Sequence, residues 1–226
     1  MTDIFREVDE ELRRDRLEKL WKRYGVLIVV AVVAAVAGTA GFMAWRNWQQ
    51  SQAETQTQQL ADALRLAGAP DGQGGTAGGN PEAAADALSA FAGQTGAGPG
   101  TLARFYEAGL RAREGNGDAA VSIYDQLAQS SGVAQVYRDL ATVLSVMHQV
   151  QSGDPGQLRA RLQPLTAETS PWRHSARELT ALLAIRAGDR DTAAKLFAQL
   201  QGDASAPSGV RNRATELAAL YAVEPQ

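Results

Sequence analysis

Residues 25–45 (GVLIVVAVVAAVAGTAGFMAW) form an uninterrupted run of 21 residues without a charged side chain. As an α-helix rising about 1.5 Å per residue, this run is about 31 Å long, close to the ~30 Å hydrocarbon core of a bilayer. Amphipathic aromatic rings stand at both of its ends, where membrane–water interfaces favour them: Trp21, Tyr24, Trp45 and Trp48. We therefore predict a transmembrane helix at 25–48.

Basic residues lie almost entirely on one side of this run. Seven precede it: Arg6, Arg13, Arg14, Arg16, Lys19, Lys22 and Arg23. Only Arg46 follows it before Arg65. The positive-inside rule then predicts a cytoplasmic helix at 1–24 and export of the rest of the chain. The apolar stripe of this helix, with Ile4 as its first residue, is short, so a solvated helix and a docking face both stay open.

A cleaved signal peptide is the competing interpretation of the N-terminal region. The small residues from Ala37 to Ala40 could supply a cleavage site. However, the charged region before the run has about 24 residues, and the run itself exceeds the ~7–15 apolar residues typical of a signal peptide. These lengths favour an uncleaved anchor.

The next segment, 49–80, is predicted to hold a helical extension followed by a linker. Leu60, Leu64 and Ala67 recur at helical spacing. Residues 68–80 (GAPDGQGGTAGGN) contain six glycines, a composition typical of a flexible linker. Such a linker could let the exported domain move relative to the anchor, or it could be an insertion without a role.

Beyond residue 80 the sequence predicts an all-α domain at 81–226. Short helical segments alternate with Gly, Asp and Pro, and no run alternates apolar and polar residues as a strand would. The expected helices cover 81–92, 101–114, 118–130, 133–150, 155–167, 171–187, 189–201 and 207–222.

An internal repeat appears at an offset of 73 residues. The segment that begins at Leu102 (LARFYEAGLRAREGNGDAAVSIYDQLAQ) aligns with the one that begins at Ser175 (SARELTALLAIRAGDRDTAAKLFAQLQG). Matched positions include Gly115 with Gly188. The offset is about twice the length of a 34–37-residue helical hairpin, and a more degenerate pair, Val133 to Leu165, lies between the two copies.

These pairs resemble tetratricopeptide repeats. The small residue of the first helix and the A-x-x-x-aromatic signature of the second occur in both copies: Ala108 and Ala181, then Ala120…Tyr124 and Ala193…Phe197. Two features depart from the motif, since Arg104 and Arg177 replace a large residue and the Leu-Gly pair is absent. The resemblance implies a right-handed α-solenoid with a concave groove. By motif position, that groove would present Phe105, Arg113, Glu178 and Arg186 to a partner.

The order of an N-terminal DIFREVDEELRRDRLEKLWKRYG, one anchor and weak repeats ending in PWRHSARELTALLAIRAGDRDTAAKLFAQL resembles the ancillary SecYEG translocon subunit family. That family shares its repeat domain with a periplasmic cell-division coordinator. The resemblance implies an inner-membrane protein of Gram-negative bacteria with a periplasmic C-terminal domain. It implies protein partners near the translocon, with translocon subunits, periplasmic chaperones and envelope proteins as candidates.

The sequence offers no pattern for catalysis, for a cofactor or for a metal. The two histidines, His148 and His174, lie in no ligand or catalytic motif, and there is no cysteine. A G-x-G-x-x-A match that begins at Gly72 lacks the preceding strand of a dinucleotide site. The net charge of −3 and the absence of a basic stripe argue against nucleic acid.

Three functions follow as hypotheses. The first is an accessory subunit of the Sec translocon that hands exported proteins to periplasmic partners. The second is a cell-envelope or cell-division coordinator that binds wall-synthesis machinery through its repeats. The third is a membrane-bound hydrolase with an unrecognised site, which the absence of motifs disfavours; we therefore expect a protein that is not an enzyme.

Overall fold

The computed structural model describes residues 30, 34–48, 50–51, 54–68 and 79–221. The chain forms two compact units, Met1–Thr55 and Gln56–Gln226. Within the described residues the regular structure is helical throughout and no strand occurs. The all-α prediction is therefore confirmed for this part of the chain.

In the first unit, residues 34–48 are helical and every one of them is exposed. Their large apolar side chains contact no core: Val36, Phe42, Met43, Trp45 and Trp48. In the part of the chain that the structure describes, no helix is both long enough and apolar enough to cross a membrane. The predicted cytoplasmic helix at 1–24 lies outside the described residues, and the predicted transmembrane helix at 25–48 lies partly outside them.

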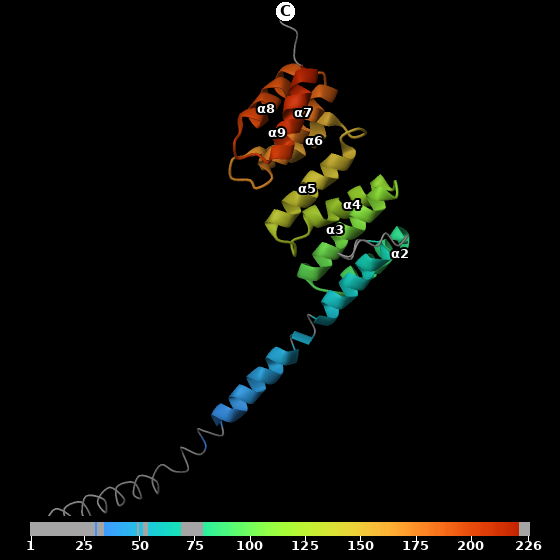
Figure 1. Ribbon diagram of the computed structural model, residues 1–226, viewed down its shortest axis with the longest axis vertical. Helices are drawn as coiled ribbons and strands as arrows, with labels where there is room; N and C mark the ends of the chain where they lie inside the picture. The colour runs from blue at the N-terminus through green and yellow to red at the C-terminus, as the bar shows by residue number, and fades with distance from the viewer. Residues whose placement is uncertain (1–29, 31–33, 49, 52–53, 69–78, 222–226) are drawn as a thin grey trace, which may run out of the picture. The chain divides into compact units, whose positions relative to one another are not determined.

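The second unit is a succession of helices, each packed against the next (Figure 1). Residues 56–66, which belong to a helix that the structure describes from residue 54 onward, come first. They are followed by α2 (Pro81–Gln94), α3 (Ala97–Arg113), α4 (Gly117–Gln129), α5 (Gln135–Gln149), α6 (Pro155–Leu162), the 3₁₀ helix η1 (Gln163–Thr166), α7 (Arg173–Arg186), α8 (Arg190–Gly202) and α9 (Ser208–Leu220). All eight helices predicted beyond residue 80 are present, with α6 and η1 sharing the predicted 155–167.

Most boundaries lie within two residues of the predicted ones, and two of the differences involve proline. Helix α3 begins at Ala97 rather than at residue 101, although Pro99 lies within it. Proline is tolerated there because the first turn of a helix has no use for its missing N–H group. Helix α7 begins at Arg173 rather than at residue 171, because Pro171 and Trp172 form a turn.

Side-chain caps fix where several helices begin. The side chains of Asn80, Asn116, Asp154 and Asp189 each accept a hydrogen bond from the backbone N–H group three residues further on. Such a cap satisfies one of the otherwise unpaired amides at a helix start and contributes about 1 kcal/mol. The sequence encodes these starts locally, so the helices are placed before any tertiary packing is considered.

The internal repeat is reproduced in the backbone. Gly115 and Gly188 have φ angles of +84° and +78°, and each ends the first helix of a hairpin. In both turns the glycine N–H bonds the carbonyl three residues back, and the next residue's N–H bonds the carbonyl five residues back. This is the Schellman arrangement, in which glycine adopts the left-handed conformation without strain.

The repeat also extends further than the sequence comparison indicated. Helix α9 follows α5 at the same 73-residue offset, and equivalent backbone bonds precede both helices. We call α3–α5 the first repeat copy and α7–α9 the second repeat copy. Each copy is a hairpin plus the first helix of the next pair.

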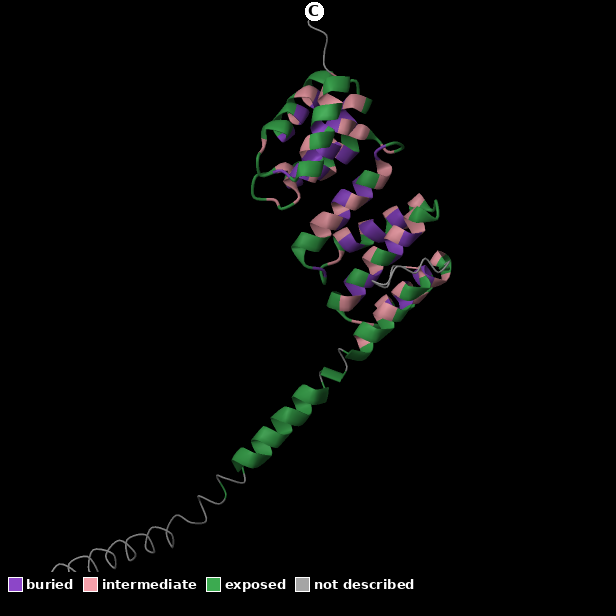
Figure 2. Ribbon diagram, in the orientation of Figure 1, coloured by how far each residue is buried: buried purple, intermediate pink, exposed green. Residues whose placement is uncertain are grey.

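The core lies along the stack in successive clusters, each shared by neighbouring helices (Figure 2). Alanines stand where the two helices of a hairpin approach, and all four signature alanines are fully buried: Ala108, Ala120, Ala181 and Ala193. The signature aromatics Tyr124 and Phe197 are also buried in these clusters. Small side chains permit close helix approach, and each aromatic fills the space that remains.

The glycine-rich segment does not separate an anchor from the domain. Leu60, Ala63 and Leu64, which precede it, pack in one cluster with α2, which follows it. Its two ends meet, because the Asn80 N–H donates to the Leu66 carbonyl over 2.8 Å. Gly68 has a φ of +69°, as expected at the end of the first helix of a hairpin. The segment thus joins two helices of one hairpin, and the compact unit begins at Gln56, before the boundary predicted at 81.

This assignment predicts that residues 69–79 can be removed. A deletion that joins Gly68 to Asn80 recreates the Gly-Asx turn of the other hairpins. Because the loop-closure entropy changes only slowly with loop length, we expect the free energy of unfolding to change by less than about 1 kcal/mol. Urea unfolding of the full chain followed by circular dichroism measures it. As a control, Leu64→Ala should be destabilising, by about 1–3 kcal/mol, since it truncates a half-buried side chain in the same hairpin. Loss of cooperative unfolding in the deletion variant would refute the assignment.

Candidate partner-binding surface

Helix α3 exposes apolar side chains on the side away from its core stripe. Ala103 and Leu110 are buried against the preceding hairpin, whereas Leu102 and Tyr106 are 44% and 50% exposed. Leu102 and Tyr106 are four residues apart, so they lie on one face of the helix. A helix that buries one apolar stripe and exposes another has surface available for a partner.

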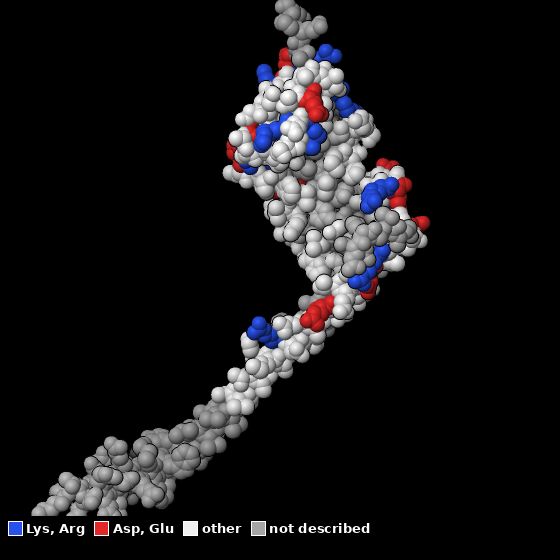
Figure 3. Space-filling view, in the orientation of Figure 1, with Lys and Arg blue, Asp and Glu red and all other residues white. Residues whose placement is uncertain are grey.

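Helix α5 continues this exposed apolar surface. Val136 and Tyr137 at its start are each 42% exposed. The half-buried ring of Phe105 joins the two helices, because its centroid lies 6.3 Å from that of Tyr137 and 6.0 Å from that of Tyr124. We define the α3–α5 face by five residues: Leu102, Phe105, Tyr106, Val136 and Tyr137. In Figure 3 the stack shows few charged side chains over α5, while they gather over α7–α9 and again at the α2–α4 end.

The four predicted groove residues are distributed between exposed and paired positions. Arg113 is exposed at the last position of α3, and Phe105 packs among the aromatic rings just described. Arg186 donates to the carbonyls of Val150 and Gly153, so it closes the turn after α5. Their role in partner binding stays a prediction, and Phe105 and Arg186 have intramolecular contacts as well.

Glu178, the fourth of these residues, is buried and paired. The Arg213 Nε and Nη2 groups donate to its two carboxylate oxygens over 2.6 and 2.9 Å. This bidentate contact ties α7 to α9, and the Glu178 carboxylate holds the pKa of Arg213 above its usual range. Glu178 occupies the repeat position of Phe105, so the two copies use different chemistry at the same place.

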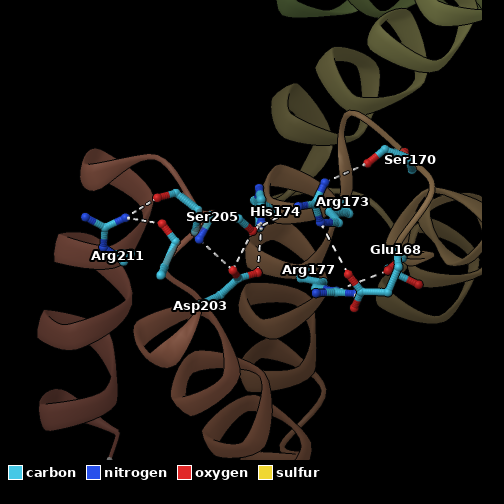
Figure 4. A network of polar contacts seen from close by, with 11 residues as sticks. Glu168, Ser170, Arg173, His174, Arg177, Asp203, Ser205 and Arg211 are labelled. Carbon is cyan, nitrogen blue, oxygen red and sulfur yellow. Dashed lines mark hydrogen bonds and ion pairs between the residues drawn. The ribbon is translucent and has the colours of Figure 1, made fainter.

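A histidine, an aspartate and a serine meet beside the start of α7 (Figure 4). His174 Nε2 lies 2.9 Å from Asp203 Oδ2, and the Ser205 hydroxyl donates to Asp203 Oδ1 over 2.5 Å. Ser205 Oγ also lies 3.4 Å from the same nitrogen, His174 Nε2. In a catalytic triad the carboxylate and the hydroxyl contact opposite ring nitrogens. Here both face one nitrogen, so the arrangement ties the α8–α9 loop to α7 rather than activating a nucleophile.

The electrostatics of this cluster favour a charged Asp203. Hydrogen bonds from the Ser205 hydroxyl and backbone N–H, followed by the contact with His174, hold the pKa of Asp203 well below its ordinary value of 3.8. The other histidine, His148, stacks on Tyr124 with the ring planes 11° apart. Among the described residues, no group of three or more His, Asp or Glu side chains could hold a metal ion.

Two hollows lie beside arginines at equivalent repeat positions. One, of about 550 Å³, lies between α6, η1, α7 and α8 and is lined in part by Arg159, Arg177 and Gln199. The other, of about 390 Å³, lies where α2, α3 and α4 meet and is lined in part by Arg104 and Gln126. These arginines are the two positions at which the sequence departs from the tetratricopeptide motif.

Sequence reasoning missed the exposed part of the α3–α5 face. The apolar residues Leu102, Tyr106, Val136 and Tyr137 were assigned no role. Their signal was present, because α3 carries more apolar positions than one buried stripe can use. The sequence alone, however, does not tell which of two apolar stripes the neighbouring hairpin covers.

Successive helix pairs closed by Gly-Asx turns, with an exposed apolar face and a shared core, define a helical-hairpin repeat protein. The profile of the tetratricopeptide repeat-like domain family matches residues 18–145, more than half of the chain. The chain therefore belongs to the tetratricopeptide repeat-like domain family. Neither the search of curated proteins nor that of solved structures gave a match. The predicted repeat fold is confirmed; the narrower resemblance to translocon subunits, the right-handed sense and the groove stay predictions.

The Asp203 cluster predicts a pH-dependent stability difference. A carboxylate whose pKa is lowered by folding stabilises the protein above its ordinary pKa and loses that contribution as the pH falls towards the lowered value. Asp203→Asn should therefore lower the melting temperature at pH 7, and the difference from the wild type should shrink between pH 5 and pH 3. Melting curves of both proteins across this range measure the effect.

The control is Asp191→Asn, which removes an exposed carboxylate from the opposite end of the same helix, α8. Its melting temperature should differ little from that of the wild type at either pH. A difference for Asp203→Asn that is constant between pH 7 and pH 3 would contradict a role for the charged form.

Proposed function

We propose that this chain is a membrane-anchored, protein-binding scaffold that serves as an accessory subunit of the Sec translocon and passes exported proteins to periplasmic partners. Its location would be the bacterial inner membrane, with the N-terminus cytoplasmic and the C-terminal domain periplasmic. The observation that carries the protein-binding part is the exposed α3–α5 face on a tetratricopeptide repeat-like domain. Stacked hairpins of this kind typically use extended surfaces to bind other proteins.

The composition of the α3–α5 face supports a protein partner. Its exposed members are two tyrosines, a leucine and a valine. Tyrosine is enriched among the residues that dominate binding energy, because it buries a large rigid area and keeps a hydroxyl for hydrogen bonding. An aromatic and aliphatic surface of this kind loses contact with water when a partner packs on it.

The anchor is supported by the exposed helix at 34–48 together with the uncharged sequence around it. Ordinary water-soluble helices bury their apolar residues, whereas this segment exposes Val36, Phe42 and Met43. The sequence from 25 to 45 carries no charge that would need to enter hydrocarbon. A bilayer would cover these side chains and would place Trp45 and Trp48 at an interface.

The proposed topology predicts protease access from the periplasmic side only. In spheroplasts, proteinase K should digest the region from α2 to α9 and leave a small N-terminal fragment that carries the apolar run. Immunoblotting with an N-terminal tag identifies the fragment. A cytoplasmic marker protein that stays intact is the control for membrane integrity, and a full-length chain that survives digestion would exclude the topology.

The proposed partners predict crosslinks from the α3–α5 face. A photoreactive residue at position 106, or at 113 nearby on the same helix, should crosslink in living cells to translocon subunits or to proteins in transit. A photoreactive residue at Gln201, which is exposed on α8, is the matched control and should give no such adduct. Adducts identified by mass spectrometry as wall-synthesis or division proteins would favour the envelope-coordinator hypothesis. The absence of any adduct specific to position 106 or 113 would count against this face as the binding surface.

A further inference from the structure

Two arginines stand where the repeat motif calls for a large residue, and the proposed scaffold function assigns them no role. Arg104 on α3 and Arg177 on α7 occupy equivalent positions in the two repeat copies. Each lines a hollow together with a glutamine from the following helix, Gln126 or Gln199. A charged group at a buried position is costly unless something compensates it. The compensation differs between the two sites.

Arg177 is almost completely withdrawn from solvent, with a side chain 7% exposed. Its Nε group donates to the Thr166 carbonyl over 3.1 Å, and its Nη2 group donates to Glu168. Its remaining nitrogen, Nη1, makes no hydrogen bond to the residues that the structure describes, although the side chain lines the hollow. The guanidinium therefore keeps donor capacity for a ligand in that space.

Among the described residues, only one carboxylate contacts Arg177, and it belongs to a residue in a surface loop, Glu168. The Glu168 side chain is 73% exposed, and Arg173 Nε lies 3.4 Å from its second oxygen (Figure 4). Arg173 Nε is buried and makes no hydrogen bond, so the ion pair with Glu168 has poor geometry. Because Glu168 is accessible from solvent, another carboxylate can take its place without leaving the buried Arg177 unpaired.

The side chains that line the hollow favour a ligand that carries an anionic group next to a short apolar group. Arg159 contributes a second guanidinium, whose Nη1 group donates to Asp189 over 3.3 Å, and no acidic residue is among the lining residues. Gln199 and Thr192 supply polar side chains, and Leu196 supplies the apolar contact. A planar guanidinium fits a carboxylate through two parallel hydrogen bonds, and Nη1 and Nη2 of Arg177 offer this geometry once Glu168 has left Nη2.

We propose that this hollow binds a carboxylate of a partner polypeptide, which takes the place of Glu168 on Arg177. The proposal deepens the protein-binding part of the proposed function and is independent of the anchor and of the translocon. The structure favours a carboxylate over a phosphate because a carboxylate of the chain itself already contacts this guanidinium. The carboxylate could come from a chain end or from an acidic side chain.

The equivalent arginine provides a matched comparison. Arg104 contacts Gln126 and lies 3.9 Å from Glu107, whose side chain is only 7% exposed. Glu107 belongs to the same helix and is buried, so it cannot leave as a loop residue can. Arg104 is thus neutralised internally and should not respond to an added carboxylate.

The test measures binding of a dye-labelled peptide, Gly-Ser-Ala-Leu-Glu, to the full-length chain in detergent by fluorescence anisotropy. Four versions combine a free or amidated C-terminus with Glu or Gln as the last residue. The doubly neutral peptide should bind at least about tenfold more weakly than the peptide with both carboxylates, as expected for loss of a charged hydrogen bond. The two singly charged versions tell whether the chain end or the side chain supplies the carboxylate.

Three variants make the test specific. Arg177→Gln should weaken binding of the charged peptide at least about tenfold. Glu168→Gln should strengthen it, up to about fivefold, because the internal competitor loses its charge. Arg104→Gln should leave it unchanged. The gain in the Glu168 variant is the decisive result, since damage to the fold would not produce tighter binding.

Equal binding of the neutral and charged peptides, or no gain in Glu168→Gln, would overturn the proposal. Competition by inorganic phosphate at lower concentration than by acetate would also overturn it, in favour of a phosphate site. Crosslinks from position 106 do not depend on this hollow, so failure here leaves the proposed function to be judged by those crosslinks.

Discussion

Each helix of this domain depends on its neighbours to cover its apolar stripe. Ala84, Leu88 and Phe91 of α2 are buried because the helix at 54–66 lies on one side and α3 on the other. The same holds along the stack, where every cluster combines residues from consecutive helices. Stability in such a chain is a sum of contacts between neighbours, since no single hairpin can bury its own apolar face. The consequence is a long surface whose chemistry can change from one hairpin to the next.

The parts of the fold that the sequence predicted are those that local chemistry determines. Asn116 and Asp189 cap helices with their own side chains, and Gly115 and Gly188 end helices in a conformation that suits glycine. These signals need no knowledge of the rest of the chain. The 73-residue offset added the order of the hairpins, and the backbone bonds repeat at the same offset.

The parts that could not be predicted depend on contacts between distant residues. The glycines of 68–80 indicated a linker, yet Leu60 and Leu64 before them pack with α2 after them. Likewise, His174 gave no motif, because its partner Asp203 lies 29 residues away in the sequence. The groove assignment of Glu178 did not foresee Arg213, which lies 35 residues further on. In each case the sequence spacing indicates which contacts a side chain could make, and the tertiary structure determines which of them it makes.

The two repeat copies illustrate how one backbone supports two surfaces. At one repeat position, Phe105 packs at a tilt against Tyr124 and Tyr137, whereas Glu178 binds Arg213 through two charge-assisted hydrogen bonds. The first copy joins its third helix by aromatic packing and leaves Leu102 and Tyr106 exposed beside it. The second copy adds an ion pair to the apolar packing of its third helix. Closure of the hairpins depends on Gly-Asx turns and buried alanines, which the two copies share. The position of Phe105 and Glu178 takes no part in that closure, so its residue can differ between the copies. This division explains how an exposed apolar face and a charged end can occur in one stack without disturbing its core.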